Sequence, residues 1–352
     1  MSRQMRDKAR INTRVTLKDV AELAGVHPGT ASRALNQETR PLLNDHTAQR
    51  VLAAAERLGY RPNPIARGLK TSRSYTVGVL IPDLLNPLFP PIVRGIQDRL
   101  DEAGYTPLIA NTDNDADREL VAFETLRARQ VDGFITATAR QDRRMMDELA
   151  QLDRPVVLVN RRLEGGELPA VVGDDLIGAR RAVEHLVGLG HRRIAHIAGP
   201  QNLSTGHLRH EGFLQAIRDA GLEPDDKLIL TAQAFVESEG ERLCGELLDT
   251  GHELTAIVAG NDLMALGCYD AFVARGLRCP DDISVVGFND MPFADWFSPP
   301  LTTIRIPHYE IGSQAASLLL ELLGDPDSDA ARRQVLLDPT LVVRKSTAPP
   351  NG

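Results

Sequence analysis

Beyond Val77, the chain alternates between two kinds of pattern. Short apolar runs rich in β-branched residues are separated by stretches with helical spacing of apolar residues, such as Ile92–Ala103 and Arg118–Arg129. Such alternation builds βαβ units, in which parallel sheets are covered by helices on both faces. The length leaves room for two halves, so we predict an α/β fold with two doubly wound parallel sheets. The runs predicted as strands are Val77–Ile81, Pro107–Ala110, Gly133–Thr136, Val156–Val159, Ile194–Ala198, Ala256–Ala259 and Ile283–Gly287.

A different pattern occupies Val15–Asn36, ahead of this region. Thr16 and Asp19 have the spacing of a capping box, which predicts a helix start, and Gly25 suits its end. A second helix follows, with His27 as its cap and Pro28 in its first position. Two short helices joined by a glycine-containing turn form a helix-turn-helix. The outward positions of the second helix are small, polar or basic, as suits the DNA major groove: Pro28, Gly29, Thr30, Ser32, Arg33 and Asn36.

A third helix is predicted over Asp45–Leu58, after a loop at Gln37–Asn44 that Pro41 interrupts. Gly59 is placed to end this helix. We expect its inward face to consist of Val51, Leu52, Ala55 and Leu58.

The charge is distributed unevenly along the chain. Residues 1–73 carry 14 Lys/Arg against 6 Asp/Glu, a balance of +8, whereas the remainder carries 26 against 42, a balance of −16. A basic N-terminal segment followed by an acidic remainder is typical of a nucleic-acid-binding segment attached to a soluble domain. The sequence therefore favours DNA as a partner of the N-terminal fifth.

Several classes of protein are not expected. Cys244, Cys268 and Cys279 are too few and too scattered for a disulfide framework or a metal site, so we expect reduced, buried thiols. The first 14 residues have no apolar core and no run approaches 18 apolar residues, so we expect neither an export signal nor a membrane span, and a cytoplasmic protein at the nucleoid.

Catalysis is not expected either. The motifs GxSxG, GxGxxG after a strand, the Walker loop and HExxH do not occur. The spacing of His185, His191 and His196 does not converge on a metal. The pairs Asp174-Asp175 and Asp281-Asp282 are expected to be loop caps or solvated charges. We therefore predict no catalytic residue, no metal site and no cofactor.

The order of several longer motifs resembles the LacI/GalR family of bacterial transcription regulators. The segments VTLKDVAELAGV, TASRALN and RVLAAAERLGYRPNPIARGLK are similar to that family's DNA-binding headpiece and hinge. The later segments VGVLIPDLLNPLF, HLVGLGHRRIAHIAGP, NDLMALG, DISVVGFND and PPLTTIRIP are similar to its ligand-binding core. The resemblance runs from about Val15 to Thr347.

This resemblance implies a domain plan with a core like that of periplasmic binding proteins. The core, at 74–347, is expected to bind an effector and to dimerise, and to have two lobes between which the chain crosses near Gly173, Ile304 and Leu337. The expected segments are a disordered basic arm at 1–14, a helix-turn-helix headpiece at 15–62, a hinge helix or linker at 63–73, an N-lobe at about 74–173 and 305–336, a C-lobe at about 174–304 and 337–347, and a tail at 348–352.

The resemblance also implies which residues contact DNA. Base reading falls to Pro28 and Gly29, which lack side-chain donors and offer only shape or apolar contact, and to Arg33, a candidate for a bidentate contact to guanine or else a phosphate contact. His27 stands where the family usually has Ser, and either caps the helix or reaches a base edge. Residues expected to hold phosphates are Thr16, Thr30, Ser32 and Asn36.

In the family, the hinge folds on operator DNA and a leucine from each subunit wedges into the minor groove. Leu69 matches that wedge, and Ala66 matches the residue that packs against the partner's hinge. Gly68 stands where a more helix-favouring residue is usual, which should weaken the hinge helix by up to about 1 kcal/mol.

Effector contacts are also implied by resemblance, at Phe89, Asn160, Thr205, Arg209, Phe235, Asn261 and Asn289. The two phenylalanines would cover the faces of a ring, although each alone also suits a core. Asn261 and Asp262 could equally cap the helix that starts at Leu263. Relatives that bind neutral sugars often have Asp in place of Asn160 and Asn289. Losing two carboxylates around Arg209 favours an anion, so a sugar acid or a phosphorylated or carboxylated metabolite is a hypothesis.

Together these features predict a homodimeric transcriptional repressor that binds a pseudo-palindromic duplex operator under the control of a small, carbohydrate-derived effector. Effector and operator affinities must then be coupled reciprocally. Two alternatives keep DNA binding but make the metabolite a co-repressor, or let a protein partner set the switch. A solute-binding protein for transport would need an export signal and no headpiece, so the sequence disfavours it.

Overall fold

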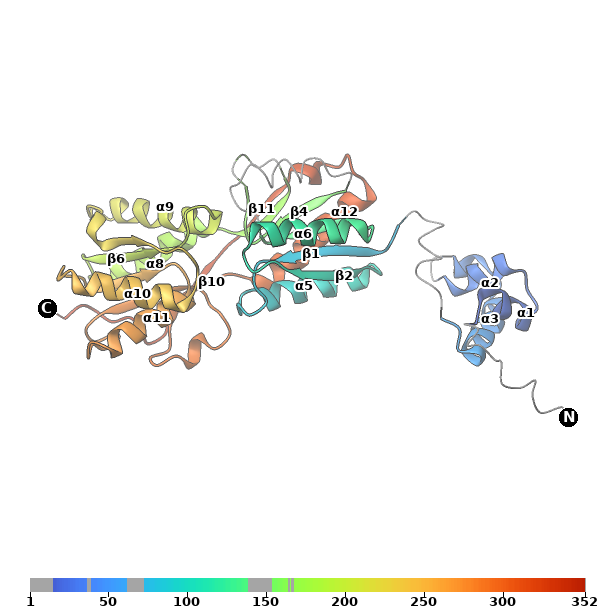
Figure 1. Ribbon diagram of the computed structural model, residues 1–352, viewed down its shortest axis with the longest axis horizontal. Coiled ribbons are helices and arrows are strands. Elements are labelled where there is room, and N and C mark those ends of the chain that lie inside the picture. The colour runs from blue at the N-terminus through green and yellow to red at the C-terminus, as the bar shows by residue number, and fades with distance from the viewer. Residues whose placement is uncertain are drawn as a thin grey trace. The chain divides into compact units, whose positions relative to one another are not determined.

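The computed structural model describes residues 15–36, 39–61, 73–138, 154–163, 165 and 168–351. The chain divides into two compact units, Met1–Ser74 and Tyr75–Gly352. Figure 1 shows helices in the first unit and sheets flanked by helices in the second. The predicted arm at 1–14 and, apart from residue 73, the predicted hinge at 63–73 lie outside the described residues.

Among its described residues, the first unit packs three helices around a core of small side chains. These are α1 (Leu17–Leu23), α2 (Pro28–Leu35) and α3 (Asp45–Leu58). The alanines let the helix backbones approach closely, so a short segment can enclose a core. The buried side chains are Val20, Ala21, Ala24, Ala31, Ala34, Val51, Ala54 and Ala55.

The predicted ends of these helices are confirmed. Gly25 and Gly59 have φ values of 62° and 64°, in the left-handed region that glycine adopts at low cost. The inward face of α3 was predicted in part wrongly: Leu52 is only half-buried, whereas Ala48 and Ala54 are buried. The predicted loop before α3 also contains a 3₁₀ turn, η2 (Arg40–Leu42).

The described part of the second unit contains two six-stranded sheets. The first has the order β11-β5-β4-β3-β1-β2, and all its strands are parallel. Helices α5 (Phe89–Glu102) and α12 (His308–Gly324) cover one face, and α6 (Ala116–Ala128) covers the other. The strands are β1 (Thr76–Ile81), β2 (Thr106–Asn111), β3 (Gly133–Thr136), β4 (Val156–Val159), β5 (Ala170–Gly173) and β11 (Gln334–Leu337).

The second sheet has the order β12-β10-β9-β8-β6-β7. Its edge strand β12 runs antiparallel to β10, which departs from the predicted all-parallel arrangement. Helices α8 (Asp175–Gly188) and α9 (Ser204–Asp219) cover one face, while α10 (Glu237–Asp249) and α11 (Asp262–Val273) cover the other. The strands are β6 (Ile194–Ala198), β7 (Ile229–Thr231), β8 (Ala256–Ala259), β9 (Ser284–Asn289), β10 (Thr302–Arg305) and β12 (Thr340–Val342).

The chain passes between the two sheets three times: after β5, after β10 and after β11. We call each sheet with its helices a lobe, and each passage a crossing. Short 3₁₀ turns complete the fold at η3 (Asp226–Leu228), η4 (Ala294–Trp296) and η5 (Asp329–Arg332). None of the helices among the described residues is long and apolar enough to cross a membrane.

Candidate functional site

Helix α2 begins with a cap made by its histidine. The Nδ1 atom of His27 accepts a hydrogen bond from the Gly29 backbone N–H at 3.1 Å, so the capping alternative is the one observed. With Nδ1 accepting, the neutral ring carries its proton on Nε2 and keeps one donor there. A Cβ at Gly29 would lie 3.2 Å from His27 Nδ1, so the glycine leaves room for this cap.

Helix α1 is capped as predicted. The Thr16 hydroxyl accepts from the Asp19 N–H at 3.4 Å, and the Asp19 carboxylate accepts from the Thr16 N–H at 2.8 Å. The Thr16 N–H and the Thr16 hydroxyl both donate to this carboxylate and lower the pKa of Asp19, because they stabilise its charged form. The Thr16 side chain is thus engaged in the cap, which the phosphate assignment did not anticipate.

Two arginines that the sequence analysis did not single out close the other ends of these helices. Arg50 donates to the carbonyls of Ala24 and Gly25 after α1, and Arg40 donates to the carbonyl of Ala34 in the last turn of α2. A cation there satisfies free carbonyls and interacts favourably with the helix dipole. Arg33, by contrast, is exposed on α2.

A cavity of about 270 Å³ lies between the two lobes of the second unit. It opens at the carboxyl ends of the parallel strands, the usual ligand position in doubly wound sheets. All seven residues that the sequence analysis assigned to an effector line this cleft: Phe89, Asn160, Thr205, Arg209, Phe235, Asn261 and Asn289.

Arg209 is the centre of the polar network in the cleft. Its Nε donates to Asp175 at 2.7 Å, Nη1 to the Gly260 carbonyl at 2.8 Å and Nη2 to Asn289 Oδ1 at 3.2 Å. Its guanidinium carbon lies 3.8 Å from the centroid of the Phe288 ring. These contacts fix the planar fork in one orientation.

The role expected for Asp175 is wrong. Asp174 caps α8 through the Ile177 N–H, but Asp175 is neither a cap nor solvated: its side chain is 5% exposed and pairs with Arg209. Burial raises the pKa of Asp175, and the guanidinium opposes that shift. The sequence pattern places both aspartates at a helix start but does not reveal a partner 34 residues away.

The three cleft asparagines are held by different devices. Asn160 and Asn289 have φ values of 64° and 111°, a left-handed region that Asn tolerates better than most residues. Asn261 caps α11, with Oδ1 accepting from the Met264 N–H at 2.9 Å, so its capping alternative is confirmed. Asp262, the other suggested cap, is instead a buried residue inside α11.

Aromatic rings enter the cleft from both lobes. Phe89 is the first residue of α5 and is buried, whereas Phe235 is half-buried and lies over Gly199. A Cβ at Gly199 would lie 2.2 Å from the Phe235 ring, so only glycine lets the ring occupy this position.

Further lining residues come from loops that sequence reasoning left unassigned. Most follow the carboxyl end of a strand, which is the signal that could have found them. They are Asp83, Asn86, Leu88, Asn114, Arg161, Pro200, Asn202, Leu203, Gln233, Ala234 and Val236. Amides therefore predominate among the polar groups of the cleft.

The three histidines that follow one another from α8 to β6 form hydrogen bonds to hydroxyl and carbonyl groups. His185 bonds to the Thr347 hydroxyl, His191 to Thr255 and the Ala348 carbonyl, and His196 to the Val258 carbonyl. Within the described ranges, no group of three or more His, Cys, Asp or Glu side chains could hold a metal ion. Cys244 and Cys268 are buried free thiols, as expected, and Cys279 is half-buried.

Each of the two units contains a segment that matches a known protein family. Residues 16–63 match the model of bacterial regulatory proteins of the lacI family, and residues 183–347 match a periplasmic binding protein-like domain. The HTH-type transcriptional regulator DegA of Bacillus subtilis (strain 168) is 34% identical over 341 residues, covering 96% of this chain and 99% of DegA. The HTH-type transcriptional repressor CytR of Escherichia coli (strain K12) is 35% identical over 335 residues, covering 95% and 97%.

Solved structures are similar over nearly the whole chain. The lac repressor dimer bound to operator and the anti-inducer ONPF aligns with a TM-score of 0.84 and 30% identity, covering 95% of this chain and 99% of that chain. A complex of the transcriptional regulator CelR with cellobiose aligns with a TM-score of 0.73 and 30% identity, covering 95% and 100%.

Proposed function

The chain belongs to the lacI family of bacterial regulatory proteins, and from that premise we propose that it is a transcriptional repressor controlled by a small molecule in its cleft. The single observation that carries the effector part is the convergence of all seven anticipated side chains on one cavity. The relatives are transcription regulators, and we propose no catalytic step for this chain.

We propose that α2 reads the major groove. Arg33 is exposed and supplies a two-pronged donor for guanine, a contact worth about 1–3 kcal/mol of discrimination. The cap supports a second reading contact, because His27 Nδ1 is engaged and Nε2–H is the donor of the neutral ring. Pro28 and Gly29 would add shape and apolar contact only. Thr30, Ser32 and Asn36 would hold phosphates, with Thr16 contributing while it caps α1.

Ala66 and Leu69, which lie outside the described residues, complete the proposed DNA interface. Leu69 would wedge into the minor groove at the centre of a pseudo-palindromic site, and Ala66 would pack against the same segment of a second subunit. The lac repressor structure is that of a dimer on its operator, which supports a dimer here. Leu69→Ala should weaken operator binding and spare non-specific binding; equal losses on both in a titration at fixed salt would refute the wedge.

For the effector, we propose a neutral carbohydrate rather than an anion. Arg209 is already paired with Asp175, so its charge is balanced inside the protein, and the anionic hypothesis loses its main support. Phe89 and Phe235 offer apolar faces to a sugar ring, and the amides offer both donors and acceptors to hydroxyl groups. Relatives include a ribose operon repressor and a regulator solved with cellobiose.

Two measurements test this function. Capture of genomic fragments with and without cell extract should recover a pseudo-palindromic sequence that extract releases; if extract instead strengthens capture, the effector is a co-repressor. Calorimetry with ribose, cellobiose and matched sugar acids should show binding of a neutral sugar. Binding of only the acids would overturn the neutral assignment, and no preference for any duplex over calf-thymus competitor would overturn the function.

A further inference from the structure

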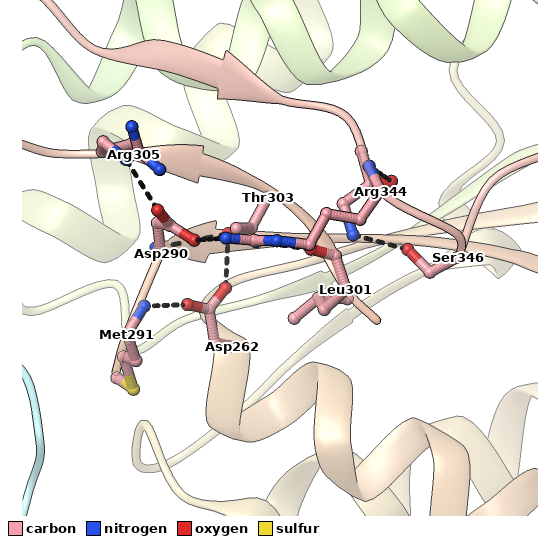
Figure 2. Close-up of polar contacts among 9 residues, drawn as sticks. Asp262, Asp290, Met291, Leu301, Thr303, Arg305, Arg344 and Ser346 are labelled. Carbon is pink, nitrogen blue, oxygen red and sulfur yellow. Dashed lines mark hydrogen bonds and ion pairs between the residues drawn. The ribbon is translucent and has the colours of Figure 1, made fainter. Parts of the chain in front are cut away.

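The dipeptide Asn-Asp occurs at the ends of two neighbouring strands beside the cleft. Asn261-Asp262 follows β8, and Asn289-Asp290 ends β9, which is hydrogen-bonded to β8. In both pairs the asparagine lines the cleft. The aspartate side chains are buried, Asp262 completely and Asp290 to 8% exposure, and both take part in the network of Figure 2.

The first aspartate holds the strand that precedes the second crossing. Asp262 accepts from the Thr303 hydroxyl on β10 and from the Met291 backbone N–H at 2.6 Å. The Thr303 oxygen in turn accepts from the Asp290 N–H at 3.4 Å. Thr303 therefore links the two Asn-Asp pairs, as Figure 2 shows.

The second aspartate binds two arginines. Arg305 Nε donates to Asp290 Oδ2 at 2.7 Å, and Arg344 Nη2 lies 2.7 Å from Asp290 Oδ1 as an ion pair without an aligned hydrogen bond. Arg344 also donates through Nη1 to the Leu301 carbonyl at 2.8 Å. Figure 2 shows the Asp290 carboxylate between both guanidiniums.

Arg305 lies at the second crossing, whereas Arg344 lies past β12, at the end of that strand farther from the third crossing. Arg305 is the last residue of β10, after which the chain passes to α12 in the other lobe. Arg344 follows β12, the strand that the chain forms directly after returning from β11. The Asp290 carboxylate therefore contacts both β10, the strand from which the chain leaves this lobe, and the segment after β12, the strand with which the chain re-enters it.

The turn at Asn289-Asp290 connects the ion pairs of Asp290 to the cleft. Asn289 and Asp290 have φ values of 111° and 53°, so two successive residues adopt left-handed backbone that the surroundings must hold in place. The same turn sets the Asn289 amide against Arg209 Nη2 at 3.2 Å. A backbone shift of Asn289 toward a ligand would therefore also move Asp290, since the two residues share a peptide bond.

We propose that Asp290 is a positioning residue that couples the cleft to the second crossing and to the segment after β12, the strand that the third crossing leads to. It holds the Asn289 amide in the cleft and, through Arg305 and Arg344, these two segments. Asp262 and Thr303 also hold this turn, because they accept hydrogen bonds from the Met291 and Asp290 N–H groups. This coupling rests on the proposed function for its regulatory meaning, because only a ligand in the cleft gives the movement a use.

Hydrogen–deuterium exchange on the full chain, without effector or DNA, tests the coupling. Asn289→Gly removes the cleft amide and keeps the positive φ at low cost. It should raise exchange about tenfold in peptides that cover residues 344–346, because energetic coupling is reciprocal. Exchange at residues 303–306 should also rise but is not decisive, because Arg305 pairs directly with Asn289 between β10 and β9. Asp290→Asn should give the same pattern. The double variant should resemble Asp290→Asn alone, since both changes act through one turn.

The matched control is Asp282→Asn, which removes the charge of another aspartate beside an arginine in the same lobe, 3.5 Å from Arg278. It should leave the peptides that cover residues 303–306 and 344–346 unchanged. Faster exchange confined to the cleft in Asn289→Gly, or additive effects in the double variant, would overturn the proposal, because a merely structural Asp290 predicts those results.

If Asp290→Asn does not fold by circular dichroism, Arg305→Gln replaces it, because that side chain is 55% exposed. Exchange in peptides covering residues 288–291 should then rise, and unchanged exchange there would refute the coupling. Absence of sugar binding in calorimetry would count against the proposed function alone, because the exchange experiment contains no ligand.

Discussion

The side-chain hydrogen bonds that cap α2 and bind its last turn join residues two to six positions apart. In the cleft, the contacts of Arg209 join residues 34 to 80 positions apart. The helix therefore presents exposed groups on a locally determined frame, whereas the cleft presents buried groups that depend on the whole lobe. Changes at α2 should affect binding with little effect on folding, while changes in the cleft should affect both.

The largest effect is expected from breaking the buried ion pair. Arg209→Met leaves Asp175 buried without its partner, which should cost about 3–5 kcal/mol of unfolding free energy. Urea unfolding followed by circular dichroism measures this loss. The double variant Asp175→Leu/Arg209→Met should recover part of it, since no buried charge remains; a loss below about 1 kcal/mol in the single variant would contradict the central role of this pair.

Acidification is expected to destabilise the second unit. Burial lowers the pKa values of His196 and His308 from 6.5 to about 3, so their stabilisation is present above pH 6.5 and is lost as the pH falls toward 3. Burial raises the pKa of Asp262 to about 7, with the opposite sign: its stabilisation is present below pH 3.8 and is lost as the pH rises through 7.

Burial also lowers the pKa values of His185, His191 and His210 and raises that of Asp175, so five imidazoles oppose two buried carboxyls in this interval. The unfolding free energy from urea titrations should therefore fall between about pH 6.5 and pH 5, by up to about 1.4 kcal/mol per pH unit for each net proton. His196→Gln/His308→Gln should flatten the slope, and Asp262→Asn should steepen it. Identical slopes in all three proteins would show that these groups do not control the pH dependence.

A smaller and more selective effect is expected on α2. Arg33→Ala should weaken operator binding by about 1–3 kcal/mol and leave the unfolding free energy within about 0.5 kcal/mol, because the side chain is exposed. Fluorescence anisotropy on operator and random duplexes distinguishes a guanine contact of Arg33 from a phosphate contact. Equal losses on both duplexes would assign Arg33 to phosphate rather than to guanine.

The smallest effect is expected at the helix cap. Thr16→Ala should cost the first unit about 0.5–2 kcal/mol, since the Asp19 N–H loses its side-chain acceptor. Hydrogen exchange of α1 measures this local loss, with Thr16→Ser as the matched control that keeps the hydroxyl. A change in the exchange of the cleft peptides would contradict the local character of this frame.

Local patterns predicted much of the first unit correctly. The capping box at Thr16, the cap at His27 and the glycine ends of α1 and α3 depend on neighbours within one helical turn, so a single sequence reveals them. Leu52 was predicted as an inward residue and is not part of the core, because Ala48 and Ala54 share the buried face with Val51. Which apolar residue faces inward depends on where the other helices pack.

In the second unit, the sequence alone determined the alternation of strands and helices, because the apolar period of each segment follows from its own residues. Resemblance supplied the cleft residues, and all of them line one cavity. Only the tertiary structure decided that Asp175 balances Arg209, that β12 turns antiparallel and that Asp290 joins β10 to the segment after β12. Each of these facts depends on distances between residues far apart in the chain, and such distances exist only once the sheets have formed and excluded water.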